Sequence, residues 1–420
     1  MADSNKHTPS LRFPEFNSAP GWIILPIGEV ADTFSGGTPY VGNSDFYGGT
    51  IPFIRSGEIA CEKTAISLTE YGLSNSAAKM IKKGTLLYAL YGATSGNVAI
   101  SKIDGAINQA ILAIIPKDDK YNNYFVYYFL EYQKPSVLSK YLQGGQGNLS
   151  AAIINSIPIA IPCNCDGTIS CDEQAKVVDI LLSLDSLIAA TKSKLEQLKE
   201  HKRGLIQRLF PARGKTVPEL RFTEFRNDGE WEIKKLRDIA TFSKGKGISK
   251  TDVTANGTTP CIRYGELYTT YKETITDVSS YTDLPVTDLF LSKANDVIIP
   301  SSGETKEDIA TASCIIKDGI AIGGDINVVR TSNNGIFLSY YLTYVKKNDI
   351  ARIAQGVSII HLYNEQLRDL VVELPNSIKE QQRIADCLQS VDNIIKSYED
   401  KITALELHKK GLMQQLFPKL

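Results

Sequence analysis

The chain is poor in the residues and segments that usually mark an enzyme or a membrane protein. Its 420 residues include 4 histidines, 2 tryptophans and 3 methionines, and no apolar run approaches the roughly 20 residues that a membrane helix needs. The 46 Lys and Arg residues balance 47 Asp and Glu residues, and the net charge of -1 argues against a polycation that binds nucleic acid through charge alone. The polar N-terminus lacks the apolar core of a secretory signal, so we expect a cytoplasmic protein whose 7 cysteines are thiols.

Motifs of nucleotide-driven and methyl-transfer chemistry are also missing. Gly245–Lys250 contains glycine and lysine, but not at the spacing of a phosphate-binding loop, and no Gly-x-Gly-x-x-Gly turn is present. The Asn/Asp-Pro-Pro-Tyr/Phe motif of adenine-N6 methyltransferases is absent too. Cys163, Cys165 and Cys171 could supply three zinc ligands, but their spacing is poor and no histidine lies nearby. We therefore expect no catalytic residue, no metal and no bound cofactor in this chain.

What the sequence does contain is an internal duplication. Leu11–Phe16 and Leu220–Phe225 both read Leu-Arg-Phe-x-Glu-Phe, and each is followed by one of the two tryptophans, Trp22 and Trp231. Further matches join pairs of segments: Ile51–Ile59 with Thr259–Leu267, Tyr127–Tyr128 with Tyr340–Tyr341, and Ile157–Pro162 with Leu370–Pro375. A repeat of this length means two copies of one domain in one chain, in agreement with the total length.

The repeat is strongest where each copy ends. Glu173–Pro211 aligns with Glu380–Pro418 without a gap and is identical at roughly 17 of the 39 positions. Both segments have apolar residues at alternating spacings of three and four, which predicts a coiled-coil helix of about 37 residues, roughly 55 Å long. The predicted seam positions are Leu184, Ile188, Leu195, Leu198, Leu205 and Leu209 in the first copy, and Val391, Ile395, Ile402, Leu405, Leu412 and Leu416 in the second.

Two such helices in one chain are expected to pack on each other, antiparallel, because neither is stable alone in water. An acidic first turn suits the start of each helix, while Pro211 and Pro418 end them. Lys202 and Lys409 are unusual at seam positions, and we expect them to reach solvent or to mark where the coil splays.

Between these helices the pattern mixes short strands, helices and glycine-rich loops, so each lobe is predicted to be α+β. In the first lobe Asn122–Leu142 is expected to be a helix. The predicted strands of that lobe are Ile51–Ile54, Leu86–Leu90, Asn97–Ile100, Ala110–Ile115 and Ile157–Ile161.

Two diverged lobes, each followed by a nearly identical heptad helix ending in Leu-Phe-Pro, resemble the specificity subunit of type I restriction-modification systems. The resemblance covers essentially the whole chain and includes Ile107–Ile111 and Gly147–Ser150. It implies two globular target recognition domains separated by two long antiparallel coiled-coil helices, related by a pseudo-two-fold internal repeat. The implied parts are a first domain at 1–171, a central helix at 172–211, a second domain at 212–378 and a final helix at 379–420.

The resemblance further implies a sequence-specific, non-catalytic DNA-binding subunit. Each lobe would read one half of a split site in double-stranded DNA, and the helices would set the spacing between the halves. Its partners would be two modification subunits, which carry S-adenosylmethionine, and two restriction subunits, which use ATP and Mg, with no membrane involved. The alternative is a coiled-coil scaffold that binds two protein partners without DNA.

Residues that read bases should lie in loops that differ between the copies, because repeated residues must serve both halves. Arg55 and Arg263 recur beside a Gly-Glu pair, which leaves three roles open: a structural salt bridge, a phosphate contact or base reading. Asn148 is either a DNA contact or the N-cap of the next helix. The other candidates for DNA binding are Tyr40, Asn43, Gln143 and Gln146 in the first lobe, and Lys244, Lys246, Lys250, Ser301, Ser302 and Lys306 in the second.

Overall fold

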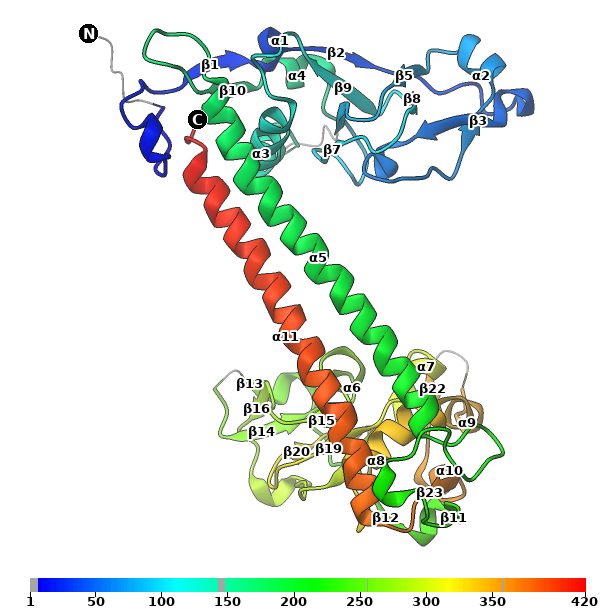
Figure 1. Cartoon of the computed structure of the whole chain (residues 1–420). Helices are drawn as coiled ribbons and strands as arrows, with labels where there is room; N and C mark the ends of the chain where they lie inside the picture. The colour runs from blue at the N-terminus through cyan, green and yellow to red at the C-terminus, as the bar shows by residue number, and fades with distance from the viewer. Residues whose placement is uncertain (1–6, 143–147, 255, 357–358) are drawn as a thin grey trace. The chain divides into compact units, whose positions relative to one another are not determined.

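The computed structural model describes residues 7–142, 148–254, 256–356 and 359–420 (Figure 1). Two compact units make up the chain: Met1–Lys192 together with Asp400–Leu420, and Ser193–Glu399. Each unit combines small sheets with helices, which confirms the α+β class. Among the described residues, no helix is both long and apolar enough to cross a membrane.

The first unit contains two four-stranded sheets and one two-stranded sheet. The antiparallel sheet has the order β2 (Ala31–Ser35), β9 (Ile111–Pro116), β6 (Leu86–Ala89), β7 (Val98–Ile100). The mixed sheet has the order β4 (Ser67–Leu68), β3 (Tyr47–Ile54), β8 (Gly105–Ile107), β5 (Lys79–Ile81). The third sheet pairs β1 (Ile23–Pro26) with β10 (Pro158–Ile161). The helices of this lobe are α1 (Ile27–Val30), α2 (Glu70–Ser74), α3 (Asn123–Leu142) and α4 (Ala151–Ser156).

The second unit repeats this plan and extends it. Its largest sheet has the order β12 (Ala240–Lys244), β21 (Ile326–Thr331), β17 (Asp296–Pro300), β19 (Ser313–Ile315), β15 (Thr274–Ile275). The next has the order β13 (Val253–Thr254), β16 (Ser280–Thr282), β14 (Thr259–Ile262), β20 (Ala321–Ile322). Two further pairs are β11 (Glu232–Lys235) with β23 (Val371–Leu374) and β18 (Ser302–Gly303) with β22 (Ile360–His361). The helices of this lobe are α6 (Glu266–Thr269), α7 (Lys306–Ile309), α8 (Gly335–Tyr340), α9 (Lys347–Ile353) and α10 (Asn364–Arg368), with a π-helical turn at Tyr341–Val345 after α8.

The duplicated sequence thus gives duplicated pairing. β1 pairs antiparallel with β10 just as β11 pairs with β23, and the parallel pair β3·β8 returns as β14·β20. The order β2-β9-β6-β7 returns as β12-β21-β17-β19. Every strand predicted for the first lobe is present, as is the helix predicted at Asn122–Leu142.

The two long helices are α5 (Cys171–Leu209) and α11 (Ile378–Leu416), each 39 residues long. All predicted seam positions are buried or half-buried. In the first unit α5 and α11 run antiparallel, since Asp185 pairs with Lys409 and Lys192 pairs with Glu406. In the second unit Lys202 pairs with Asp392 and Lys199 pairs with Glu399, which gives the same antiparallel sense. The prediction of packed antiparallel helices is therefore confirmed within each unit.

Each lobe's core includes the start of its own helix and the end of the other copy's helix. In the first unit Trp22 and Phe125 pack against Phe417 at the end of α11, with ring centroids 6.4 and 5.6 Å from that ring. In the second unit Trp231 and Phe337 pack in the same way against Phe210 at the end of α5, at 6.3 and 5.4 Å. The phenylalanine of each repeated Leu-Phe-Pro end is thus buried in a lobe core. The heptad pattern did not indicate this.

A buried ion pair fixes the start of each long helix. Arg12 donates two hydrogen bonds of 2.7 Å to Glu173, and Arg221 donates two of 2.8 Å to Glu380. Both carboxylate side chains are only 1% exposed. The acidic first turn therefore serves mainly as the partner of the Leu-Arg-Phe segment, and bidentate geometry makes this pairing specific.

One predicted match is wrong by one residue. The hydroxyl of Tyr128 donates to Asp185, and the equivalent bond to Asp392 comes from Tyr340. Tyr128 therefore corresponds to Tyr340, and Phe129 corresponds to Tyr341 in the two aromatic clusters. Two consecutive tyrosines in each copy suggested the other alignment, but burial selects the residues that face the long helix.

Candidate nucleic-acid interface

The first lobe has a concave site where three loops converge. A pocket of about 420 Å³ is lined by the turn after β3, by the loop after β6 and by the segment after β8. These contribute Arg55, Ser56, Gly57, Glu58, Tyr91, Gly92, Asn108 and Ala110. Polar side chains and open glycine backbone in a shallow concavity suit the edge of a base pair or a phosphate.

The second lobe has a larger pocket, of about 940 Å³, at the equivalent place. The turn after β14 and the segment after β20 line it again, together with the loop that follows β12. Its principal polar residues are Lys250, Arg263, Tyr264, Glu266, Tyr268, Glu304 and Asp325. The duplication has therefore kept the pocket while replacing most of its lining.

The strand register makes the correspondence between the two pockets exact to the residue. Ile54 pairs with Ile107 in the parallel β3·β8 ladder, and Ile262 pairs with Ile322 in β14·β20. The following residues, Asn108 in the first lobe and Gly323 in the second, thus occupy the same position.

The repeated arginine has different partners in the two lobes. Nε of Arg55 lies 2.9 Å from Glu58, which holds the pKa of the Glu58 carboxyl below its usual range through a side-chain hydrogen bond. In the second lobe Glu266 accepts from the backbone N–H of Arg263 and from the hydroxyl of Ser280. Within the described part of the chain, the Arg263 guanidinium has no ion pair, and its Nε is buried without a hydrogen-bond partner.

The predicted DNA contacts of the first lobe lie in different settings. Tyr40 is 75% exposed, and Asn43 caps a short turn through the N–H of Asp45. Asn148 is exposed and forms a β-bridge with Tyr91, beside the pocket. It is not the N-cap of α4, as the alternative interpretation held, because Ser150 accepts from the N–H of Ile153. Gln143 and Gln146 lie outside the described residues.

In the second lobe the predicted contacts divide into pocket and non-pocket residues. Lys250 and Arg263 line the pocket. Lys244 lies 3.9 Å from Asp325, Lys246 and Lys306 are exposed, and Ser301 is buried. Ser302 shares a hydrogen bond with His361. The sequence did not predict four of the pocket residues: Tyr264, Tyr268, Glu304 and Asn108. The only signal for them was their position beside segments that differ between the copies.

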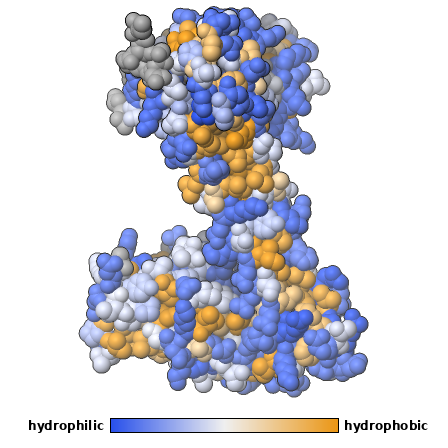
Figure 2. All heavy atoms as spheres, turned by 60° about the vertical axis from the view of Figure 1, so that its left-hand side comes forward, coloured by the Kyte–Doolittle hydropathy of each residue, from blue (hydrophilic) through white to orange (hydrophobic). Residues whose placement is uncertain are grey.

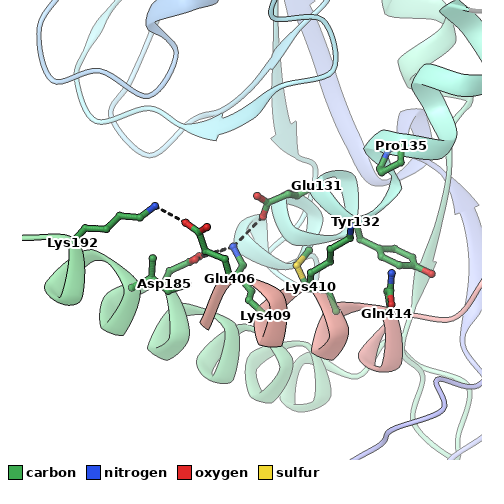
Figure 3. A pocket seen from close by; sticks show the side chains of 11 residues that line it. Glu131, Tyr132, Pro135, Asp185, Lys192, Glu406, Lys409, Lys410 and Gln414 are labelled. Carbon is green, nitrogen blue, oxygen red and sulfur yellow. Dashed lines mark hydrogen bonds and ion pairs between the residues drawn. The ribbon is translucent and has the colours of Figure 1, made fainter. Parts of the chain in front are cut away.

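Each unit also contains a charged cluster where the long helices meet the lobe. Lys409 lies 2.8 Å from Asp185 and 3.3 Å from Glu131, and its ammonium stands 5.1 Å from the centre of the Tyr128 ring. Figure 3 shows Lys409, Asp185 and Glu131 at a pocket of about 430 Å³, whose apolar wall includes Tyr132 and Met413. Burial, then the Asp185 carboxylate, raises the pKa of Tyr128 far above its ordinary value, so this hydroxyl stays protonated and donates.

The second unit repeats this cluster with Lys202. This lysine lies 2.8 Å from Asp392, 3.4 Å from Glu273 and 5.1 Å from the centre of the Tyr340 ring. The seam lysines therefore neither reach solvent nor mark a splayed coil, because each is held by two carboxylates and a tyrosine face.

The surface of the first unit is apolar near this pocket. Figure 2 shows hydrophobic side chains gathered on the helices next to the lobe, whereas the lobe itself is mostly hydrophilic. Leu187 of α5 is 44% exposed, and its repeat equivalent in the second unit, Ile394 of α11, is 45% exposed. The two copies thus expose an apolar residue at the same helical position.

Comparison with protein families assigns the chain to a family. The family model described as "Type I restriction modification DNA specificity domain" matches residues 20–200 and again residues 228–407. This chain belongs to that family. It is a type I restriction-modification specificity subunit with the domain present twice, and as such a non-catalytic subunit.

Curated relatives agree with this assignment. The MjaVIII specificity subunit of Methanocaldococcus jannaschii is 21% identical over an alignment of 446 positions, gaps included, which covers 98% of this chain and 94% of that protein. The MjaIX specificity subunit of the same organism is 26% identical over 256 residues, which cover 55% of this chain and 54% of that protein.

Solved structures share the fold. The crystal structure of a type I restriction-modification S subunit from M. genitalium gives a TM-score of 0.61 at 16% identity, covering 98% of this chain and all of that one. A chain from a study of complex assembly and conformational transition in a type I system gives 0.55 at 15% identity, covering 95% and 98%.

The cysteine cluster of this specificity subunit does not form a metal site. Among the described residues, no group of three or more histidine, cysteine, aspartate or glutamate side chains could hold a metal ion. Cys163 is buried, whereas Cys165 and Cys171 are exposed.

Proposed function

We propose that each lobe of this specificity subunit reads one half of a split double-stranded DNA site through its loop pocket. The observation that carries the proposal is the equivalence of the two pockets: the same turn and the same loop segment line both, yet most of the lining residues differ. Equivalent placement with different side chains is what two readers of unlike half-sites require.

The long helices are proposed to set the distance between the half-sites. Each is a continuous helix of 39 residues, which at 1.5 Å per residue is about 58 Å long. Two readers on one face of a duplex must be held about one helical turn apart, roughly 34 Å, and a rigid rod does this better than a flexible linker.

We further propose that the repeated helical surfaces recruit partner subunits. Two modification subunits would bring S-adenosylmethionine and methylate an adenine in each half-site, and two restriction subunits would use ATP and Mg. The exposed pair Leu187 and Ile394 supports two copies of the same partner, because each occupies the same helical position. The assembly would act on genomic DNA in the cytoplasm. A scaffold that binds only proteins does not account for membership of a DNA specificity family.

Co-expression of this chain with the modification subunit encoded beside it tests the proposal. Single-molecule sequencing of the host genome would map N6-methyladenine. We expect one split motif of two short half-sites around a fixed gap, in which exchange of one lobe for that of a relative rewrites one half only. A soluble complex that leaves the genome unmethylated at any split motif would contradict DNA reading by this chain.

The helical spacer has its own test. Inserting one heptad into both helices, between Lys192 and Ser193 and between Glu399 and Asp400, preserves the seam and adds about 10 Å. The gap in the motif should then widen by about three base pairs, at 3.4 Å for each pair. The matched control inserts the heptad into one helix only, which misaligns the seam and should abolish methylation. An unchanged gap after the double insertion would exclude the helices as the spacer.

A further inference from the structure

We infer that the two lobes read their half-sites with different chemistry, and that Arg263 contacts the edge of a guanine whereas Arg55 is a structural residue. This inference rests on the proposed function, since it concerns the base that the second lobe's pocket accepts. It assigns unequal roles to two arginines that the sequence repeats at the same position.

In the first lobe the Arg55 side chain already has a carboxylate partner. Both Nε and a terminal nitrogen of Arg55 donate to the Glu58 carboxylate, at 2.9 and 3.2 Å. The same carboxylate accepts from the N–H groups of Arg55 and Ala65, so it ties the guanidinium to the turn itself. The bidentate pairing holds the Arg55 guanidinium against the turn, which limits how far its remaining N–H groups can reach toward DNA.

In the second lobe the Arg263 side chain does not pair with Glu266, the equivalent of Glu58. Glu266 is 9% exposed and turns inward, with one oxygen on the N–H of Arg263 and the other on Ser280. Arg263 lines the pocket with its Nε buried, so its terminal nitrogens are the donors left for a ligand.

The charges around Arg263 favour a base over a phosphate. Glu304 and Asp325 line the same pocket as Lys250 and Arg263, so carboxylate acceptors stand beside the cationic donors. Carboxylates repel phosphate oxygens, but they accept hydrogen bonds from the amino group of cytosine. A paired arginine donor and carboxylate acceptor match the two partners of a G·C pair in the major groove, where arginine binds O6 and N7 of guanine.

Open backbone gives a base access to this arginine. Gly323 and Gly324 stand where the first lobe has Asn108 and Gln109, and a side chain on Gly324 would press against Gly247 at 3.2 Å. Tyr264 replaces Ser56 and lies beside Tyr268, with ring centroids 6.3 Å apart. The second pocket is therefore both wider and bounded by aromatic rings, which suits a planar base edge.

The test compares Arg263→Gln and Arg263→Lys with the matched variant Arg55→Gln, each in the complex with the modification subunit. The wild-type motif is determined first. R263Q and R263K should each weaken methylation about 10-fold to 100-fold at the wild-type motif and relax one guanine in one half only. R55Q should relax no base in either half of the motif, whatever overall loss of methylation follows from loosening the turn after β3. Thermal melting of each complex reports whether the variant is folded.

A modified base tests which atom of the guanine Arg263 contacts. Duplex probes in which 7-deazaguanine replaces the assigned guanine lack the N7 acceptor, so the wild-type complex should bind them more weakly than unmodified probes. R263Q should bind the two probes equally, which is the coupling expected of a direct contact.

Each outcome decides a different point. If the wild type produces no split motif, the proposed function fails. If the motif exists and R263K behaves like the wild type, or R263Q weakens all sites without relaxing any base, Arg263 contacts phosphate and the inference is overturned. A relaxed base in the R55Q motif would overturn the structural role given to Arg55.

Discussion

The two units hold the same lysine in the same way but protect it to different degrees. In the second unit Lys202, Glu273 and Asp392 are 10%, 8% and 16% exposed. In the first unit Lys409 is 13% exposed, but its partners Asp185 and Glu131 are 36% and 37% exposed. The helices carry the same lysine and the same aspartate here, so the difference comes from the lobes.

The difference in exposure comes from the tyrosine that lies four positions after Tyr340 in the second lobe and after Tyr128 in the first. Tyr344 donates to Glu273 and accepts from Lys202, which closes the second cluster. Tyr132 instead packs on Phe417 at 5.5 Å, and an open pocket remains beside Lys409. Duplication thus conserves the lysine–aspartate pair, whereas the lobe supplies the second carboxylate and decides how much water reaches the cluster and hence how much it contributes to stability.

The largest expected effect concerns the packing of each long helix's end in the lobe of the other copy. Phe417→Ala and Phe210→Ala should each lower the free energy of unfolding by about 3–5 kcal/mol, because each ring is almost fully buried among aromatic neighbours. Each change should destabilise mainly the lobe that its ring enters, not the lobe that precedes it in the sequence.

Thiol labelling separates these two lobes. In F417A the buried Cys163 should react faster with iodoacetamide than in the wild type, while Cys314 of the other unit should not. F210A should show the reverse. Equal acceleration of both thiols by either variant would contradict this packing of the helix ends.

The next effect tests the comparison of the lysine clusters. Lys202→Met should cost about 3 kcal/mol or more, because it leaves two buried carboxylates unpaired. Lys409→Met should cost about 1 kcal/mol, because water solvates the half-exposed partners. Urea unfolding of the two variants measures both values, and equal losses would show that the lobes do not set the contribution.

A smaller effect concerns the two tryptophans. Nε1 of Trp22 donates to Glu173 at 3.1 Å, whereas Nε1 of Trp231 has no partner in the described part of the chain. Trp22→Phe should therefore cost about 1 kcal/mol more than Trp231→Phe, the value of one buried hydrogen bond. Chemical denaturation of the two variants gives this difference directly, and a larger cost for W231F would reverse the comparison.

The smallest effect is on thiol chemistry in the wild-type protein. Burial raises the pKa of the Cys261 thiol to about 11 and that of Cys314 to about 12, so almost no thiolate exists there at pH 8. Exposed Cys61, Cys165 and Cys171 should be alkylated first. Raising the pH from 8 toward 10 should speed alkylation of the buried thiols by about tenfold per pH unit, because their folded pKa values lie above that range, but these thiols should still react more slowly than the exposed ones. Mass spectrometry of partially alkylated protein checks the order.

Local pattern was enough to find much of this protein. The heptads predicted two long helices because a seam repeats every seven residues, and the strands of the first lobe followed from short apolar runs between glycines. The repeat itself came from sequence identity, and it correctly matched Trp22 with Trp231.

Other features depended on contacts between residues far apart in the chain. Register in α3 and α8 could not be derived from two adjacent tyrosines, because only the position of the Asp185 or Asp392 carboxylate selects which one faces the helix. The two loop pockets were missed for the same reason, since loops from separate strands form each of them.

The sequence by itself determined the duplication, the secondary structure and the helical seam, because these depend on residues close together in the chain. Only the tertiary structure decided that each Leu-Phe-Pro end enters the other copy's lobe, and that Glu58 binds its arginine while Glu266 leaves Arg263 free. Identical motifs acquire different roles there because a side chain's partners are set by what packs around it, and the lobes have diverged.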